Sequence, residues 1–180
     1  MALPESEMRR AVNAAPPALF RKVMSRFATG VTVVTTDVGG EVFGMTANAF
    51  MAGSLTPPLC VISIARGAKM HDRLTESRKF GVSFLGEQQA PLAQHFAGRA
   101  FAPVEPVFRR LGDVSVLAGS VGVVAADIVA TAECGDHTIF MGRIAHLAVE
   151  EHAPLLLYGG RYAALDREQR LEQLGPQSFW

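Results

Sequence analysis

The chain has 180 residues, of which 49% are hydrophobic and 19% are charged, and this composition is typical of one globular domain and unlike that of a disordered chain. Its 17 Lys and Arg residues balance 17 Asp and Glu residues, so the formal net charge is zero. Because nucleic-acid-binding domains normally carry a marked basic excess, this balance argues against a nucleic-acid partner.

The N-terminal half is predicted to form one helix followed by strands. Apolar residues at helical spacing indicate a helix that opens at Pro16-Pro17 and ends at Gly30. The β-branched segment 30–36 and the segment 41–47 are expected to pair as a hairpin through Gly39-Gly40. Further along, the pattern predicts a buried strand over 59–65, a helix over 71–79 and a strand over 80–85.

The C-terminal half is predicted to be dominated by long strands. A helix over 86–98 is followed by the segment 98–119, which contains prolines and is expected to be irregular. Two long strands then meet at Gly135-Asp136-His137. The remaining expected elements are those two strands over 120–134 and 138–151, a final strand over 155–160 and a polar helix over 166–174.

Few of these strands are separated by a full helix, which disfavours a parallel, doubly wound sheet. The expected fold is therefore mainly β, an antiparallel barrel with peripheral helices. We expect residues 1–17 to be a flexible leader, residues 18–165 to form the domain, and residues 166–180 to be a C-terminal tail.

Cellular location is suggested by the apolar segments and the cysteines. The first residues, MALPESEMRR, lack the apolar core of a signal peptide, and no apolar stretch approaches the ~20 residues that a membrane helix needs. A cytoplasmic protein without a membrane partner is expected. Cys60 and Cys134 both lie in apolar surroundings and are expected to be reduced core residues rather than a disulfide framework.

The sequence contains no familiar catalytic constellation. There is no GxSxG elbow, no P-loop and no GxGxxG motif, and no two histidines or cysteines have the spacing of a zinc site. A metal site is therefore not expected. Such a sequence suits a protein whose cofactor carries the chemistry, because a cofactor needs positioning more than it needs a nucleophile or an acid–base pair.

Two segments in the first half are candidates for ligand binding. GMTANAF (44–50) places Thr46 and Asn48 among small residues, which would let a ligand approach the backbone; the alternative is a strand end with a polar turn. SIARGAKM (63–70) places a cation beside a helix start, which could bind an anion; the alternative is an ordinary basic loop.

Two further candidates lie in the second half. Gly135-Asp136-His137 could display a histidine at the rim of the barrel, or it could be plain hairpin-turn chemistry. LLLYGGRYAAL (155–165) gathers Tyr158, Arg161 and Tyr162 around two glycines, where they could contact a nucleotide; the alternative is a strand that ends in a glycine turn.

Taken together and in order, these segments resemble the short-chain flavin reductase family, the reductase partners of two-component flavin monooxygenases. The similarity looks closest to the reductases of phenol-type hydroxylases and covers nearly all of residues 18–165. The segments that carry it are FATGVTVVTT (27–36), GMTANAF (44–50), SLTPPL (54–59), ARGAKM (65–70), HFAG (95–98), GDHTIFMG (135–142) and PLLLYGGRY (154–162).

The resemblance implies a split β-barrel of the FMN-binding type, usually a homodimer. It also implies an oxidoreductase in which NADH passes hydride directly to a flavin, with FAD favoured over FMN. The reduced flavin would serve a separate flavin-dependent monooxygenase. Such a transfer requires the two rings to be held together in a reactive geometry and the growing negative charge on the flavin to be stabilised, by backbone N–H groups or by Asn48.

The resemblance also assigns residues to the two ligands. No catalytic acid or base is implied, and His137 is expected to position the nicotinamide nucleotide together with Arg161 and Tyr162. The loop over 67–70 lacks the hydroxyl cluster of many members, and Ala49 replaces a common serine. The residues implied for the flavin are Met45, Thr46, Ala47, Asn48, Ala49, Ser54, Ser63, Ile64, Ala65 and Lys69.

Two alternatives remain open at this level. One is a flavin carrier on the same barrel, without enzymatic activity. The other is an oxidase or a heme-handling protein of a related split barrel. The nicotinamide-side segments distinguish them, because only a reductase needs a site for NADH.

Overall fold

The computed structural model describes residues 16–100 and 102–165. Three α-helices, one 3₁₀ turn and twelve β-segments occur in this part of the chain. In chain order they are α2 (Pro17–Met24), β1 (Thr29–Gly30), β2 (Thr32–Val38), β3 (Glu41–Ala47), β4 (Phe50–Leu55), β5 (Pro58–Ala65), α3 (Lys69–Ser77), β6 (Lys79–Phe84), η1 (Glu87–Gln89), α4 (Ala90–Phe96), β7 (Phe108–Leu111), β8 (Val114–Leu117), β9 (Gly122–Cys134), β10 (His137–Val149), β11 (Leu156–Tyr158) and β12 (Arg161–Ala163).

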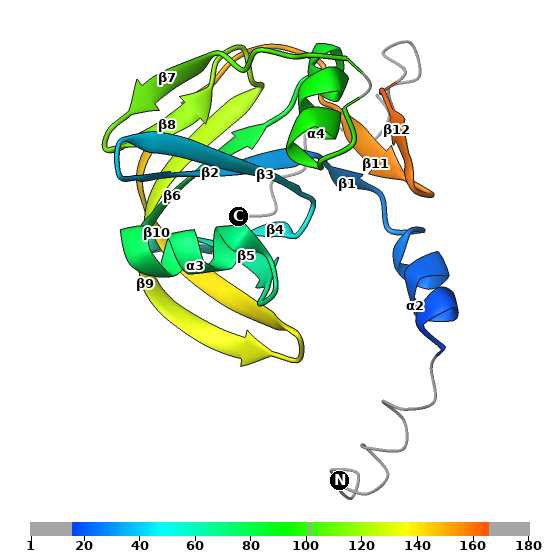
Figure 1. Cartoon of the computed structure of the whole chain (residues 1–180), viewed down its shortest axis with the longest axis horizontal. Helices are drawn as coiled ribbons and strands as arrows, with labels where there is room; N and C mark the ends of the chain where they lie inside the picture. Colours follow the sequence, from blue (N-terminus) through cyan, green and yellow to red (C-terminus); the bar gives the residue numbers. More distant parts are fainter. Residues whose placement is uncertain (1–15, 101, 166–180) are drawn as a thin grey trace, which may run out of the picture.

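A seven-stranded sheet forms the centre of the molecule (Figure 1). Its strand order is β3-β2-β6-β9-β10-β5-β4, and every pairing is antiparallel. The expectation of a mainly β chain with antiparallel strands and few short helices is thereby confirmed. Among the described strands, β3 and β4 remain the two edges of the sheet, so its ladder of hydrogen bonds does not close into a barrel.

The first hairpin has the turn that its glycines predict. β2 pairs with β3 from Thr32↔Ala47 to Val38↔Glu41. The two linking residues are Gly39 with φ +61° and Gly40 with φ +84°. A two-residue hairpin turn of this hand requires positive φ at both positions, which glycine adopts without steric cost.

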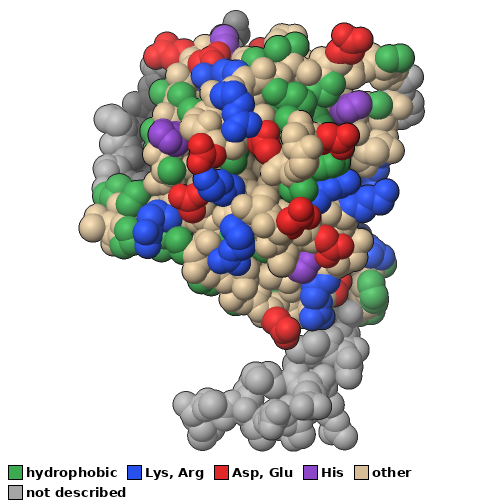
Figure 2. Space-filling model, turned by 60° about the vertical axis from the view of Figure 1, so that its left-hand side comes forward, with side chains coloured by type: hydrophobic (Ala, Val, Ile, Leu, Met, Phe, Trp, Pro, Cys, Tyr) green, Lys and Arg blue, Asp and Glu red, His purple; other side chains and the backbone are tan. Residues whose placement is uncertain are grey.

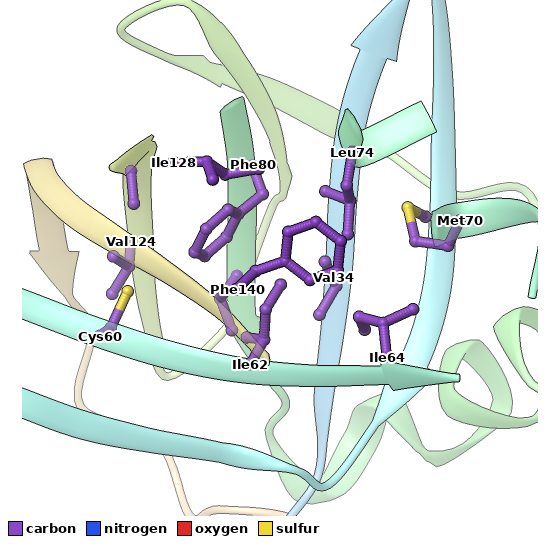
Figure 3. Packing of buried hydrophobic residues seen from close by; sticks show 12 residues of the cluster. Val34, Cys60, Ile62, Ile64, Met70, Leu74, Phe80, Val124, Ile128 and Phe140 are labelled. Atoms are coloured by element: carbon purple, nitrogen blue, oxygen red, sulfur yellow. The ribbon is translucent and has the colours of Figure 1, made fainter. Parts of the chain in front are cut away.

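The main core lies on one face of the sheet and is closed by α3 (Figure 3). Phe80 and Phe140 are its largest side chains, and Met70 and Leu74 of α3 are buried against them. In β5 every second residue is buried, so only the face with Cys60, Ile62 and Ile64 enters the core. The predicted buried strand therefore exists, but only one of its faces is buried in this chain.

Two smaller sheets flank this centre. β1, β11 and β12 form one, and the β7–β8 hairpin forms the other. The expectation that 98–119 is irregular is wrong over this hairpin. Its strands have four residues each, which is too few to show a periodicity in the sequence. A residue far away in the chain holds them in place. Asp37 accepts hydrogen bonds from both the N–H and the hydroxyl of Ser115, at 2.7 and 2.8 Å.

Other differences from the predicted elements have local causes. β4 was not expected, because a register irregularity between Ala52 and Ser54 breaks its alternation. β12 was not separated from β11 in the prediction. The helix predicted over 86–98 is a 3₁₀ turn followed by α4. The predicted helix over 166–174 lies outside the described residues, and so does almost all of the predicted leader.

The two cysteines lie in different environments. Cys60 is fully buried in the main core, whereas Cys134 is exposed at the end of β9. The expectation of two core cysteines is wrong for Cys134, because the far half of β9 extends beyond the core and is exposed there. No helix within residues 16–100 and 102–165 is long and apolar enough to cross a membrane.

The surface carries both signs of charge. On the face drawn in Figure 2, Lys and Arg side chains alternate with Asp and Glu side chains rather than gather by sign. In the described part of the chain, opposite charges also form ion pairs, as in Arg110 with Asp37 at 2.7 Å and Lys79 with Asp113. This mixture agrees with the zero net charge and offers no basic stripe on that face for nucleic acid.

Candidate functional site

A cleft opens between the end of β3, the end of α4 and the β11–β12 hairpin. We call it the hairpin cleft; its volume is about 620 Å³. It brings together two segments that are far apart in the sequence, Thr46–Asn48 and Gly160–Tyr162. The residues that line it are Val31, Thr46, Ala47, Asn48, Gln94, Ala97, Arg99, Leu157, Gly160, Arg161 and Tyr162.

The wall formed by Thr46–Asn48 is held from two sides. The Thr32 hydroxyl donates a hydrogen bond to the Ala47 carbonyl at 2.7 Å, from the neighbouring strand. The Thr46 hydroxyl donates to the Ala93 carbonyl of α4, also at 2.7 Å. The Thr46 hydroxyl therefore already donates its proton within the protein. The polar side chain at the end of this wall is the amide of Asn48, which has one donor group and one acceptor.

Gly44 has a packing role that the sequence did not indicate. A Cβ added at this position would overlap with the ring of Phe96. Here the small residue admits an aromatic ring of α4, not a ligand. The idea that all the small residues of 44–50 serve ligand approach is therefore wrong at Gly44.

The opposite wall is the β11–β12 hairpin. Its turn is Gly159 with φ +59° and Gly160 with φ +76°, and it sets Tyr158 opposite Arg161. Tyr162 pairs with Leu157 and packs partly buried against the second core cluster. The glycine turn proposed as an alternative for this segment is real, and the same turn places Arg161 and Tyr162 in the cleft.

A second group of predicted residues lies along β5 and the start of β10. His137 is opposite Ala65, Thr138 opposite Ile64, and Ile139 opposite Ser63. The Ser63 N–H donates to the Ala49 carbonyl at 3.2 Å, which joins this group to the end of the first wall. The Ile64 side chain is fully buried in the core, so only its backbone faces outward.

Other residues predicted for the flavin lie around this group. Lys69 is exposed at the first turn of α3. Met45 is half-buried on β3 and packs against the main core. Ser54 sits on β4 opposite Leu59, directly after the register irregularity.

The turn that carries His137 is anchored to the loop after β5. The Arg66 guanidinium donates to the Gly135 carbonyl, and the Arg66 N–H donates to the Asp136 carbonyl at 3.0 Å. Asp136 contacts the His137 ring nitrogen Nδ1 at 2.7 Å. This hydrogen bond and the charge of the imidazolium lower the pKa of Asp136 from its usual value, with a smaller contribution from the Arg66 charge.

A mostly apolar groove adjoins the hairpin cleft. Its volume is about 460 Å³, and Asn48 and Val31 line both hollows. Phe27, Phe50 and Phe84 contribute aromatic side chains. The remaining lining residues are Ala28, Thr29, Gly30, Thr32, Leu85, Val121, Pro154 and Leu155. Two adjacent hollows that share Val31 and Asn48, of which the hairpin cleft carries the two arginines and the groove the three phenylalanines, provide room for a ligand with a flat ring and a polar extension.

The structure therefore groups the predicted residues in two places. Thr46, Ala47 and Asn48 share the hairpin cleft with Arg161 and Tyr162. His137 is not among the residues that line either hollow. It lies instead beside Ala65, at the far end of the β9–β10 hairpin.

Residues at and just after the end of α4 also line the cleft, and the sequence did not predict them. Gln94, Ala97 and Arg99 line the hairpin cleft, and of these only Ala97 lies within the HFAG motif that carries part of the resemblance. No signal in the sequence showed that this helix end faces Thr46–Asn48. Within the described ranges, no group of three or more His, Cys, Asp or Glu side chains could hold a metal ion.

Comparisons with known proteins identify the family of the chain. The family model described as "Flavin reductase like domain" matches residues 24–166. An NADH-dependent flavin reductase of Rhodococcus sp. is 41% identical over 164 residues, which cover 88% of this chain and 92% of that protein. The reductase component of 4-hydroxyphenylacetate 3-monooxygenase from Thermus thermophilus is 38% identical over 139 residues, covering 77% and 89%.

Solved structures show the same fold. The flavin reductase PheA2 in its native state superposes with a TM-score of 0.83 at 40% identity and covers 84% of this chain and 99% of its own. The NADH:FAD oxidoreductase SgcE6 of Streptomyces globisporus, in complex with NAD and FAD fragments, superposes with a TM-score of 0.77 at 34% identity, covering 94% and 100%.

Proposed function

This chain belongs to the flavin reductase-like family, and from that membership we propose that it is an enzyme that uses NADH to reduce a flavin. The observation that carries the proposal is the hairpin cleft, in which the segment expected along the flavin meets the segment expected at the nicotinamide nucleotide. A flavin carrier needs only the first of these. The relatives named as NADH-dependent flavin reductases favour the enzyme over the carrier.

The residues around the two hollows fit both ligands. The aromatic side chains of the apolar groove suit a flat ring, and Asn48, between the groove and the cleft, offers a donor and an acceptor to a ring edge. When bound, the flavin accepts the hydride of NADH and carries the redox chemistry. The protein holds the two ligands, keeps water away from the ring and supplies hydrogen-bond donors where charge develops.

FAD is the favoured flavin, and FMN is the second choice. Lys69 and the backbone amides of the loop over 67–70 would hold the phosphate of either one. NADH is the reductant, and His137, Arg161 and Tyr162 would hold it. The other flavin contacts are those expected from the resemblance: Met45, Thr46, Ala47, Asn48, Ala49, Ser54, Ser63, Ile64 and Ala65.

The reduced flavin is supplied to a separate flavin-dependent monooxygenase. Relatives described as the reductase component of 4-hydroxyphenylacetate 3-monooxygenase and as the reductase subunit HsaB of a flavin-dependent monooxygenase support this partner. The proposed location is the cytoplasm. The proposed domain spans 18–165, between a leader (1–17) and a tail (166–180), and the family match over residues 24–166 supports it.

The fold is proposed to be a split β-barrel that works as a homodimer. Two features of the single chain support the dimer. Leu19, Phe20, Val23 and Met24 of α2 are each more than half exposed, and no residue of this helix is buried. His137 lies apart from Tyr162, and a second copy could bring one chain's His137 to the other chain's cleft.

The test is NADH oxidation by the purified full-length chain, followed by the loss of NADH absorbance. Parallel reactions contain FAD, FMN, riboflavin or no flavin. We expect oxidation that depends on added flavin, fastest with FAD. A protein that retains a yellow flavin yet does not oxidise NADH with any of the three would be a carrier, and the proposal would fail.

A further inference from the structure

One cation in the hairpin cleft has no role in the function proposed above. Arg99 follows α4 and lines the cleft together with Arg161. Neither guanidinium forms an ion pair with any residue in the described part of the chain. None of the described lining residues is acidic. The lining of the cleft therefore includes two arginines and no carboxylate that could compensate their charges.

A specific helix ending places Arg99 there. Gly98 follows α4 with φ +68°. Its N–H donates to the His95 carbonyl at 3.0 Å, and the Arg99 N–H donates to the Gln94 carbonyl at 2.8 Å. These two bonds form a Schellman motif, which reverses the chain at a residue with positive φ. This reversal places Arg99 in the lining of the cleft.

Arg161 is placed by a second glycine turn. Gly159 and Gly160 have positive φ and close the β11–β12 hairpin, and Arg161 is the first residue of β12. Two glycine-dependent turns from distant parts of the chain thus present one arginine each to the same hollow.

The end of α4 does not cancel this charge. Carbonyl groups at a helix C-terminus carry partial negative charge when they lack partners. Here the Ala93 carbonyl accepts from the Ala97 N–H and from the Thr46 hydroxyl, and the Gln94 and His95 carbonyls accept from Arg99 and Gly98. The Gln94 side chain adds a neutral amide to the cleft.

We propose that Arg99 and Arg161 form a pair that binds the pyrophosphate of a dinucleotide in the hairpin cleft, and that Arg99 is a determinant of affinity for NADH. Guanidinium groups bind phosphate oxygens through two parallel hydrogen bonds, and a pyrophosphate offers oxygens to both. The proposal rests on the proposed function, because NADH and FAD are its two sources of pyrophosphate. NADH is the favoured one, since Arg161 and Tyr162 are expected at the nicotinamide nucleotide.

The test compares the full-length chain with Arg99→Gln, Arg99→Lys and Arg143→Gln. Arg143 is an exposed arginine of β10 outside both hollows and serves as the control. The KM for NADH is measured with saturating riboflavin, which has no phosphate. The Kd for FAD is measured separately by quenching of flavin fluorescence. ADP, the pyrophosphate-bearing half of both ligands, is titrated by calorimetry.

For Arg99→Gln we expect the KM for NADH to rise about 10- to 100-fold, the loss typical of a hydrogen bond between charged groups. The turnover number should stay nearly constant, because Arg99 holds a part of the ligand that does not react. Arg99→Lys should recover part of the loss, and Arg143→Gln should match the parent. Gly98→Ala keeps the charge but disturbs the turn, so it should also raise the KM.

The three measurements (the KM for NADH, the Kd for FAD and the binding of ADP) distinguish the possible results. A weaker Kd for FAD with an unchanged KM for NADH would support the pyrophosphate pair and overturn the assignment to NADH. Unchanged ADP binding, KM and Kd in a folded Arg99→Gln protein would overturn the whole inference. If the parent did not oxidise NADH but Arg99→Gln lost ADP binding, the proposed function would fail while the pyrophosphate pair survived.

Discussion

The two cysteines show how much one residue's chemistry depends on its place in the fold. Burial raises the pKa of the Cys60 thiol to about 11, so its reactive thiolate hardly forms at neutral pH. Cys134 is exposed at the end of β9. The local sequence around each is apolar and does not separate them.

We therefore expect a thiol reagent to label the native protein at Cys134 only, and Cys60 to react once the chain is unfolded. The release of chromophore from a disulfide reagent measures this, with and without denaturant. A Cys134→Ser variant is the control and should be inert until it unfolds. Fast labelling of that variant under native conditions would contradict the burial of Cys60.

Gly81 lies where residues far away in the chain leave no room for a larger side chain. A Cβ at this position of β6 would lie 2.5 Å from the Thr35 hydroxyl oxygen and 2.9 Å from the Ser115 carbonyl oxygen. The second of these is backbone, which cannot swing aside as a flexible side chain can. Overpacking of this kind typically costs about 1–3 kcal/mol.

Gly81→Ala should accordingly lower the free energy of unfolding by about 1–3 kcal/mol, measured by urea denaturation. Gly67→Ala is the matched control, because a Cβ there meets nothing within 4 Å and its φ is not positive. Equal stability of the two variants would show that β6 shifts to accept the methyl group.

At the scale of elements, Arg66 links the loop after β5 to the β9–β10 turn. Its guanidinium holds the Gly135 carbonyl, and Asp136 in that turn contacts His137. The main-chain N–H of Arg66 also donates to the Asp136 carbonyl, and any residue at this position would keep that bond, so the guanidinium is the side-chain contribution to holding the turn. Arg66 is thus a positioning residue for His137 in the proposed reductase.

Arg66→Gln should raise the KM for NADH about 3- to 10-fold, as expected for the loss of one hydrogen bond, and leave the Kd for FAD unchanged. It should also move the pKa of Asp136 up toward its usual value, because the Arg66 charge is one of the causes that lower it. An NMR titration of the Asp136 carboxyl measures this. A raised KM for NADH without any change in the Asp136 titration would count against the idea that Arg66 positions His137 by holding the β9–β10 turn.

Helix α2 matters at the scale of the whole molecule. It projects from the body of the molecule in Figure 1, with apolar residues exposed along it. Apolar residues that recur at helical spacing and face solvent normally pack against another surface. In the proposed homodimer, a second copy of the chain provides that surface.

Phe20→Glu should therefore shift the protein from dimer toward monomer, as measured by sedimentation at micromolar concentration. Lys22→Gln, on the same helix, is the control and should remain dimeric. A parent protein that sediments as a monomer would remove the dimer from the proposal, and an unaffected Phe20→Glu dimer would place the interface elsewhere.

Local patterns determined much of this molecule. Glycines at 39 and 40 specify their turn by positive φ, and long runs rich in apolar and β-branched residues predict the strands β9 and β10. Helical spacing predicts α2, although the helix ends at Met24 and does not continue to Gly30 as expected. Each of these is predictable because the physical cause lies within a few residues of its effect. The family motifs are short and local for the same reason.

The tertiary structure decided the rest. Arg99 lines the cleft, His137 lies away from it, and Gly44 makes room for Phe96 because elements distant in sequence pack together. The short β7–β8 hairpin likewise depends on Asp37, far away along the chain. A contact between remote segments depends on the register and packing of the whole sheet, and no stretch of sequence near either partner encodes it.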